Sequence, residues 1–151
     1  MLTCFFVGGK VYEFELKGWI TGGEKGSSKL KVTINAPPQS GRCTADPPEG
    51  EALDPIFTLN CTGFTDKETP LHYEFFYSKG EGSKKETLGS GLEALRSRVT
   101  FPSGLKENDH KLTLYAKVSD SLGASRIVEF SSPIKVSSRM EIGGAFPHNS
   151  D

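Results

Sequence analysis

The sequence predicts an all-β fold, an antiparallel β-sandwich, on three observations. Apolar residues recur in short alternating bursts, which is the period of a strand with one buried face. Turn-forming residues separate these bursts about every 8–12 residues, a spacing typical of sandwiches. Helical periodicity is nearly absent, apart from slight helical character between Leu88 and Arg98.

The first predicted element is a hairpin. Val11–Leu16 and Lys29–Ile34 each alternate, and a Gly/Ser-rich loop joins them. A lone two-stranded hairpin is marginal in water, so we interpret the pair as the last two strands of an upstream sandwich repeat. The paired prolines of NAPPQSG then act as a stiff linker, and residues 1–37 form this first unit.

Residues 38–136 predict the main sandwich, because they supply about the 100 residues that such a domain needs. The strand that begins at Phe57 turns Phe57, Leu59 and Cys61 inward, because successive side chains of a strand point to opposite faces. The polar segment KGEGSKKETLGSG, residues 79–91, is predicted to form a loop that contains one short edge strand. The tail, residues 137–151, has no period and is expected to be disordered. The further strands are predicted at Leu71–Tyr77, Arg98–Phe101, Leu112–Val118, Ile127–Phe130 and Ile134–Val136.

Two of the three cysteines are candidates for a disulfide. Cys61 faces the predicted core and can reach Cys43, on the segment that leads into the sandwich. Closing the intervening loop would stabilise the domain by about 3 kcal/mol on the chain-entropy model. Such a bond requires an oxidising compartment; the alternative is two reduced cysteines in a cytosolic domain. Cys4 is either a buried free thiol or bonded to a cysteine upstream of Met1.

A glycosylation site is predicted beside Cys61. Asn60-Cys61-Thr62 is an N-x-Ser/Thr acceptor. Strand alternation places Asn60 on the solvent face when Cys61 faces the core. The glycan and the disulfide support each other, since both require the secretory route; the alternative is an unmodified asparagine.

The composition indicates no nucleic-acid partner and no membrane span within the chain. The net charge is −1 and the lysines are scattered, so no basic stripe is present. No stretch approaches the roughly 20 apolar residues that cross a bilayer. The apolar start, Met1–Val7, is too short for a signal-peptide core. We therefore expect a fragment whose targeting and membrane segments lie outside it.

No catalytic residue and no cofactor can be assigned. The sequence lacks a Gly-x-Ser-x-Gly, His-Glu-x-x-His or Walker A motif. We interpret Gly80–Lys85 as a solvated loop and Asp109-His110 as an exposed turn. We expect Glu13 and Glu15 to lie on the solvent-exposed face of one strand.

Asp66 follows a strand at a turn and is expected to cap it by accepting backbone N–H groups. A calcium site with Glu68 or Asp120 as further ligands is the alternative. Ca²⁺ is coordinated by six to eight oxygen ligands, and the sequence has no Asp-x-Asp cluster that would supply them. The sequence therefore predicts no metal site.

Many spaced residues together match one known module. They resemble the receptor-for-egg-jelly (REJ) module of the polycystin family and of sperm receptors for egg jelly. The resemblance covers most of positions 8–136, although Phe64 stands where many relatives have Trp. The matching residues are Cys43, Pro47, Gly50, Ala52-Leu53, Phe57, Cys61-Thr62-Gly63-Phe64, Asp66, Pro70-Leu71, Tyr73-Glu74-Phe75, Phe101-Pro102-Ser103-Gly104 and Val118-Ser119-Asp120-Ser121-Leu122-Gly123.

The resemblance implies an Ig-like or PKD-like sandwich in the extracellular region of a membrane receptor. Such a module is non-catalytic and contributes to ligand recognition, adhesion or mechanical coupling to a calcium-permeable channel elsewhere in the parent protein. The implied partners are neighbouring ectodomain modules and an extracellular protein or glycan ligand, with the membrane reached only through downstream segments. Binding would use the loop Lys79–Gly91 or the sheet face with Tyr115 and Phe76.

A second hypothesis makes the chain an accessory carbohydrate-binding or spacer module of a secreted hydrolase or adhesin. It requires an exposed line of aromatic rings that could stack on sugars. Trp19 is the only tryptophan, and no such line is visible in the sequence.

Overall fold

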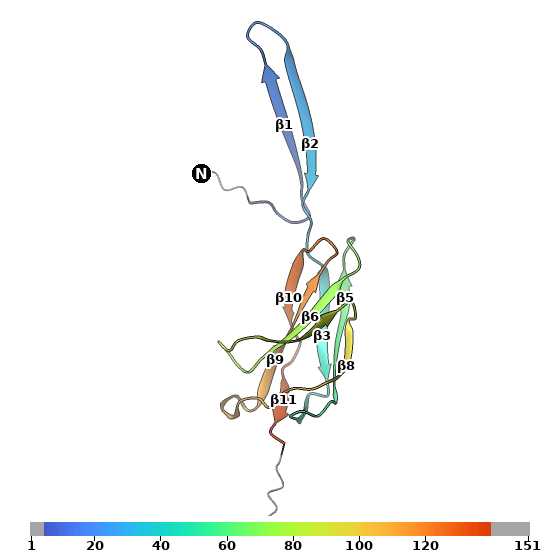
Figure 1. Cartoon of the computed structure of the whole chain (residues 1–151), viewed down its shortest axis with the longest axis vertical. Coiled ribbons are helices and arrows are strands. Elements are labelled where there is room, and N and C mark those ends of the chain that lie inside the picture. The colour runs from blue at the N-terminus through green and yellow to red at the C-terminus, as the bar shows by residue number, and fades with distance from the viewer. Residues whose placement is uncertain (1–4, 140–151) are drawn as a thin grey trace, which may run out of the picture.

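The N-terminal hairpin projects from one end of the molecule as a two-stranded sheet of its own (Figure 1). The computed structural model describes residues 5–139. β1 (Val11–Trp19) pairs antiparallel with β2 (Lys25–Thr33). Both strands are longer than predicted, because pairing continues through Gly18 and Gly26 to a short turn after Trp19. That the hairpin belongs to an upstream sandwich stays a prediction.

The remaining strands form two sheets that face each other (Figure 1). One has the order β3-β5-β8, and the other β4-β11-β9-β6-β7, with β10 also paired to β9. The predicted all-β sandwich is confirmed, with one parallel pair, β4 with β11. The strands are β3 (Gln39–Asp46), β4 (Glu49–Glu51), β5 (Phe57–Thr65), β6 (His72–Ser78), β7 (Glu86–Gly91), β8 (Leu95–Val99), β9 (Lys111–Ser119), β10 (Ser125–Glu129) and β11 (Ile134–Ser137), with a 3-10 turn at Lys106–Asn108.

The core lies between the two sheets and is supplied by strand alternation. The predicted inward residues of β5 are buried, as are the alternating apolar residues of β9, whereas Leu71 and Tyr77, at the two ends of the strand predicted over Leu71–Tyr77, are half-buried. The rings of Phe57 and Phe101 pack edge to face with centroids 5.2 Å apart. The buried apolar residues are Cys43, Phe57, Leu59, Cys61, Tyr73, Phe75, Val99, Phe101, Leu112, Leu114, Ala116, Val118, Phe130, Ile134 and Val136.

The strand predicted over Arg98–Phe101 is wrongly placed, because β8 ends at Val99. Arg98 adopts a left-handed conformation with a φ of 58°, which interrupts regular strand geometry. Phe101 is buried all the same. The slight helical character between Leu88 and Arg98 is also misleading, since the segment contains the end of β7 and most of β8.

β3 is absent from the sequence prediction, which assigned its first residues to the linker. Pairing with β5 in fact begins at Gln39. Ser40 and Gly41 both adopt left-handed conformations, with φ values of 57° and 81°, so alternation is broken where the strand starts. Cys43 is the only fully buried residue of β3, which leaves the strand without a hydrophobic pattern.

Replacing Phe101 with Ala is expected to lower the free energy of unfolding by about 3–5 kcal/mol, because it leaves a cavity between the sheets. The matched control is Leu122→Ala, since Leu122 is 70% exposed and its loss should change stability little. Urea denaturation of both variants measures the difference. Equal midpoints for the two variants would contradict this assignment of the core.

Candidate functional site

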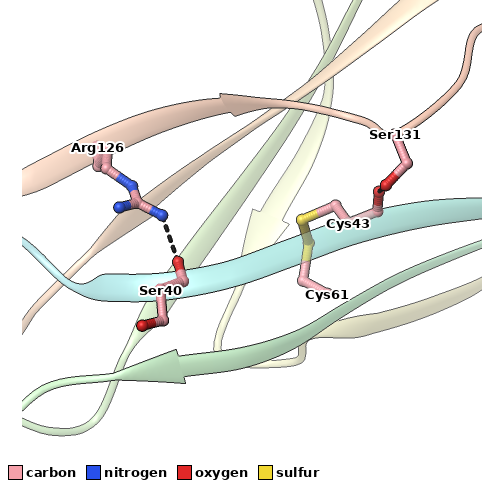
Figure 2. The surroundings of a disulfide bond; sticks show 5 residues. All are labelled: Ser40, Cys43, Cys61, Arg126 and Ser131. Atoms are coloured by element: carbon pink, nitrogen blue, oxygen red, sulfur yellow. Dashed lines mark hydrogen bonds between the residues drawn. A yellow bond between two sulfur atoms is a disulfide. The ribbon is translucent and has the colours of Figure 1, made fainter.

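Cys43 attaches β3 to both sheets of the sandwich (Figure 2). Within its own sheet it lies opposite Cys61 of β5, and the two are joined by a disulfide with Cα atoms 4.1 Å apart. Its carbonyl oxygen accepts a hydrogen bond of 3.1 Å from the backbone N–H of Ser131, just after β10 in the other sheet. Both sulfur-bearing residues are buried. The first strand is therefore fixed covalently to one layer and by a hydrogen bond to the other.

A second contact ties the start of β3 to β10. The Arg126 guanidinium donates a hydrogen bond to the carbonyl oxygen of Ser40 (Figure 2). It also lies 5.7 Å from the centroid of the Phe64 ring, a cation–π distance. A Cβ atom at Gly41 would collide with this ring, so glycine is needed there on steric grounds as well as for its positive φ.

Asn60 lies on the outer face of the three-stranded sheet, where strand alternation predicts it. It is half-buried, and its neighbour Cys61 points into the core. β5 is the middle strand, so Asn60 has Thr44 of β3 on one side and Leu95 of β8 on the other. The acceptor triplet is therefore part of a strand that is paired along both edges.

Three carboxylates meet where the linker enters the sandwich. Oxygen atoms of Asp66, Glu68 and Asp120 lie within 4.8 Å of one another. Asp120 Oδ2 accepts a hydrogen bond of 2.6 Å from Asn35 Nδ2 of the linker. Beside them is a shallow hollow of about 260 Å³, lined by the linker and by the turn from Thr65 to Glu68.

The carboxylates of this cluster mainly cap turns. Asp66 Oδ1 accepts the N–H of Glu68 at 3.0 Å, which confirms the predicted cap. Asp120 Oδ1 accepts the N–H groups of Leu122 and Ala124, both at 2.9 Å. The three carboxylates carry six oxygens, the lower end of the six to eight that Ca²⁺ prefers, and Asp66 Oδ1 and both oxygens of Asp120 already accept hydrogen bonds. Turn capping accounts for the arrangement without a metal ion.

The pKa values of the cluster are shifted in opposite directions. The Asp66 carboxylate, which accepts a hydrogen bond from the protonated Glu68 carboxyl, raises the pKa of Glu68; partial burial and the charges of Asp66 and Asp120 act the same way. The backbone N–H of Glu68 lowers the pKa of Asp66. When Glu68 is ionised, its negative charge lies beside those of Asp66 and Asp120 and is repelled by them.

The outer face of the larger sheet carries the aromatic pair considered for ligand binding. Phe76 lies opposite Tyr115 on β6 and β9, and both are half-buried. Lys85 Nζ lies 4.1 Å from the centroid of the Tyr115 ring. This lysine covers one face of the ring. β7 occupies the second half of the loop predicted from Lys79 to Gly91.

Apart from the disulfide, the long-range polar contacts described above were not predicted from the sequence. Asn35 and Asp120 are 85 positions apart, and Ser40 and Arg126 are 86. Each is a polar residue without a motif, so no local signal could have paired them. Cys4 and most of the tail predicted at 137–151 lie outside the described residues.

Comparison with known proteins identifies the family. The family model for the REJ domain matches residues 3–142. The chain belongs to the REJ domain family. This confirms the resemblance noted in the sequence, and it covers the hairpin as well as the sandwich.

Two curated relatives share the name "Polycystin family receptor for egg jelly". The protein from Homo sapiens is 38% identical over 101 residues, 60% of this chain and 4% of the relative. The one from Mus musculus is 30% identical over 118 residues, 72% of this chain and 6% of the relative. The chain thus spans only a small part of the length of these relatives.

Among solved structures, domains A168–A170 of titin superpose with a TM-score of 0.45 at 13% identity, covering 74% of this chain and 37% of that one. Within residues 5–139 no helix is long and apolar enough to cross a membrane.

Replacing Cys43 and Cys61 together with Ala is expected to lower the free energy of unfolding by about 3 kcal/mol, because the unfolded chain regains the entropy of the open loop. Urea denaturation without reductant measures the difference from the wild type. Reductant should destabilise the wild type by a similar amount and leave the double variant unchanged. Equal midpoints for oxidised wild type and double variant would contradict the disulfide's role.

Glu68→Gln is expected to raise the melting temperature at pH 7 and to have little effect at about pH 4. A carboxyl with a raised pKa in the folded state favours folding below its ordinary pKa, and this contribution is lost as the pH rises through the raised value. At pH 7 the ionised Glu68 repels Asp66 and Asp120, and the neutral amide removes that repulsion. Glu81→Gln, in an exposed loop, is the control. An effect at pH 4 but not at pH 7 would contradict the shift.

Proposed function

We propose that the chain is a non-catalytic, load-transmitting module of the extracellular region of a polycystin-like membrane receptor. The names of the relatives support a receptor as the parent protein, and the disulfide supports maturation in an oxidising compartment. In this proposal the chain lies on the outer face of the plasma membrane, and the parent protein couples it to a calcium-permeable channel. The module carries force between its neighbours rather than performing chemistry.

The single observation that carries this proposal is the path of the chain through the sandwich. The linker joins at one end, where Asn35 contacts Asp120 at the end of β9. β11 pairs with the opposite end of β9, where Ile134 lies across from Leu112. Figure 1 shows the hairpin and the end of β11 on opposite sides of the sandwich. A pull between them runs along its long axis.

The disulfide determines which bonds bear such a load. Force that arrives through β3 reaches Cys43 and crosses the covalent bond to Cys61 in β5. Residues 44–60 then lie outside the loaded path. They include β4, which pairs with β11 at only three positions, from Glu49 to Glu51. In the oxidised module the β4 backbone carries none of the pull, whereas after reduction the force runs through β4 as well as β11 and shears the pair from both sides.

The hairpin supports a place in a tandem array of modules. One of its faces is polar, with Glu13 3.3 Å from Lys29 and 3.7 Å from Lys31. The other face carries the cross-strand pair Phe14 and Leu30, which are 46% and 62% exposed. An amphipathic ribbon of this kind needs a second layer over its apolar face.

The size of that face favours a partner within the same polypeptide. Nine-residue strands at about 3.4 Å per residue, two strands wide, give a face of roughly 300 Å². This is well below the roughly 800 Å² per partner that separate chains bury in a stable complex. A neighbouring module tethered in the same chain reaches it at a high effective concentration.

The alternative, an accessory carbohydrate-binding module, gains nothing from the geometry. One face of the Tyr115 ring is covered by Lys85. Trp19 lies on the hairpin, in a different sheet from Phe76. On the hairpin, the exposed rings of Phe6 and Phe14 pack edge to face rather than forming a flat line suited to stacking on a sugar chain.

Stretching the chain between handles at its two ends tests the proposal. Reduction is expected to add about 60 Å to the length gained on unfolding. Cys61 follows Cys43 by 18 positions, and the released segment then extends at about 3.5 Å per residue. The unfolding force should also fall, because the β4–β11 pair becomes loaded.

The double variant Cys43→Ser with Cys61→Ser is the control and should behave as the reduced wild type under either condition. An oxidised module that unfolds at no higher force than the reduced one would contradict a load-bearing role. Equal length gains would contradict the proposed path of force.

A further inference from the structure

Asn60 occupies a position that a glycosylating enzyme cannot reach in the folded sheet. We propose that Asn60 receives an N-linked glycan on the nascent chain, before the Cys43–Cys61 disulfide closes, so that the two modifications compete. The inference rests on the extracellular location put forward above, and it adds to the predicted glycosylation site the order in which the glycan and the disulfide must be made.

In the folded sandwich, the backbone of the acceptor triplet is hydrogen-bonded to neighbouring strands and is not free to bind a glycosyltransferase. An enzyme that recognises Asn60 and Thr62 together must take up the three-residue segment free of its strand partners. In the fold, Asn60 pairs with Thr44 on one side and Leu95 on the other. The N–H of Cys61 donates to the carbonyl oxygen of Ala94 at 2.9 Å. All of these pairings would have to break before the segment could bind.

Cys61 adds a covalent obstacle at the middle position of the acceptor triplet. Once bonded, its Cα atom is held 4.1 Å from that of Cys43, and its side chain is buried on the core side of β5. Local opening of the sheet edge does not release it, because the disulfide persists when hydrogen bonds break. Closure of the disulfide therefore ends the period in which Asn60 can react.

The two steps draw on different reagents and use neighbouring residues. In glycan transfer, Asn60 Nδ2 forms a bond to C1 of an oligosaccharide carried on a polyprenyl pyrophosphate. The bond from C1 to the phosphate oxygen breaks, the pyrophosphate leaves with the electron pair, and the amide proton passes to an enzyme base. In disulfide closure, the Cys43 and Cys61 thiols give two electrons and two protons to a disulfide oxidant of the secretory compartment.

The order of synthesis sets the timing of the competition. Cys43 precedes Asn60, so β3 and its thiol are present when the acceptor triplet emerges. β8 begins roughly 35 residues after Asn60, which takes about 2–7 s at about 5–20 residues per second. Disulfide formation also starts on a scale of seconds. The acceptor triplet is therefore free of β8 for a few seconds, the same scale on which disulfide closure starts, so we expect partial occupancy.

The glycan would cover one outer face and leave the other open. On the smaller sheet it would lie over Thr44 and Leu95, and Leu95 is otherwise 54% exposed. Phe76 and Tyr115 lie on the larger sheet, on the far side of the core. Contacts of this module with other proteins would then use the larger sheet.

The test expresses the whole chain behind an added secretory signal and measures glycan occupancy from the mass shift on enzymatic deglycosylation. Occupancy of the wild type should be partial. Cys43→Ser removes the competing bond but keeps the Asn60-Cys61-Thr62 triplet, so occupancy should rise from partial to nearly complete. Reductant during synthesis should have the same effect on the wild type.

Two matched variants complete the design. Asn60→Gln should abolish the mass shift, and Cys4→Ser, which removes a thiol but not the partner of Cys61, should leave occupancy at the wild-type level. No glycan on either wild type or Cys43→Ser would overturn the site. Equal occupancy in the two would overturn the competition. Neither result depends on the load-bearing role, because the added signal supplies the compartment.

Discussion

The bond between Cys43 and Cys61 is the constraint on which the rest of the sandwich depends. β3 has little of its own to hold it in place, since Cys43 is its only fully buried residue. The disulfide supplies a covalent tie to β5, and the hydrogen bond from Ser131 supplies one to the opposite layer. A strand with a weak hydrophobic pattern thereby becomes the point at which linker and core are joined.

This arrangement differs from that of antibody domains, where the conserved disulfide bridges the two sheets. Here both cysteines belong to one sheet, and the bond joins directly opposite residues of neighbouring strands. Such a bond adds little to the contact between layers, which is left to Phe57, Phe101 and the other core side chains. Its effect is to fix the strand that connects to the hairpin; in the proposed load-bearing role it also removes residues 44–60 from the path of the force.

Function in this proposal depends on connection and surface rather than on a pocket. The acidic cluster at the linker is occupied with capping turns and with Asn35. One outer face carries Asn60, and the other carries Phe76 and Tyr115. A module with these properties suits a long array in which neighbours supply the missing layers.

The sequence predicted what depends on local periodicity and missed what depends on distant partners. Phe57, Leu59 and Cys61 alternate, so their burial was predictable, and the Asp66 cap lies only two residues from its donor. β3 was missed because Ser40 and Gly41 are left-handed at its start. The contact of Ser131 with Cys43 spans 88 positions and joins two residues that have no motif in common.

The most direct measurement is differential alkylation of the chain secreted from cells, followed by mass spectrometry of its peptides without reductant. The account predicts one disulfide-linked pair of peptides that contains Cys43 and Cys61, resistant to alkylation until the protein is unfolded and reduced. Recovery of either cysteine as an alkylated thiol, or of Cys61 joined to Cys4, would contradict it.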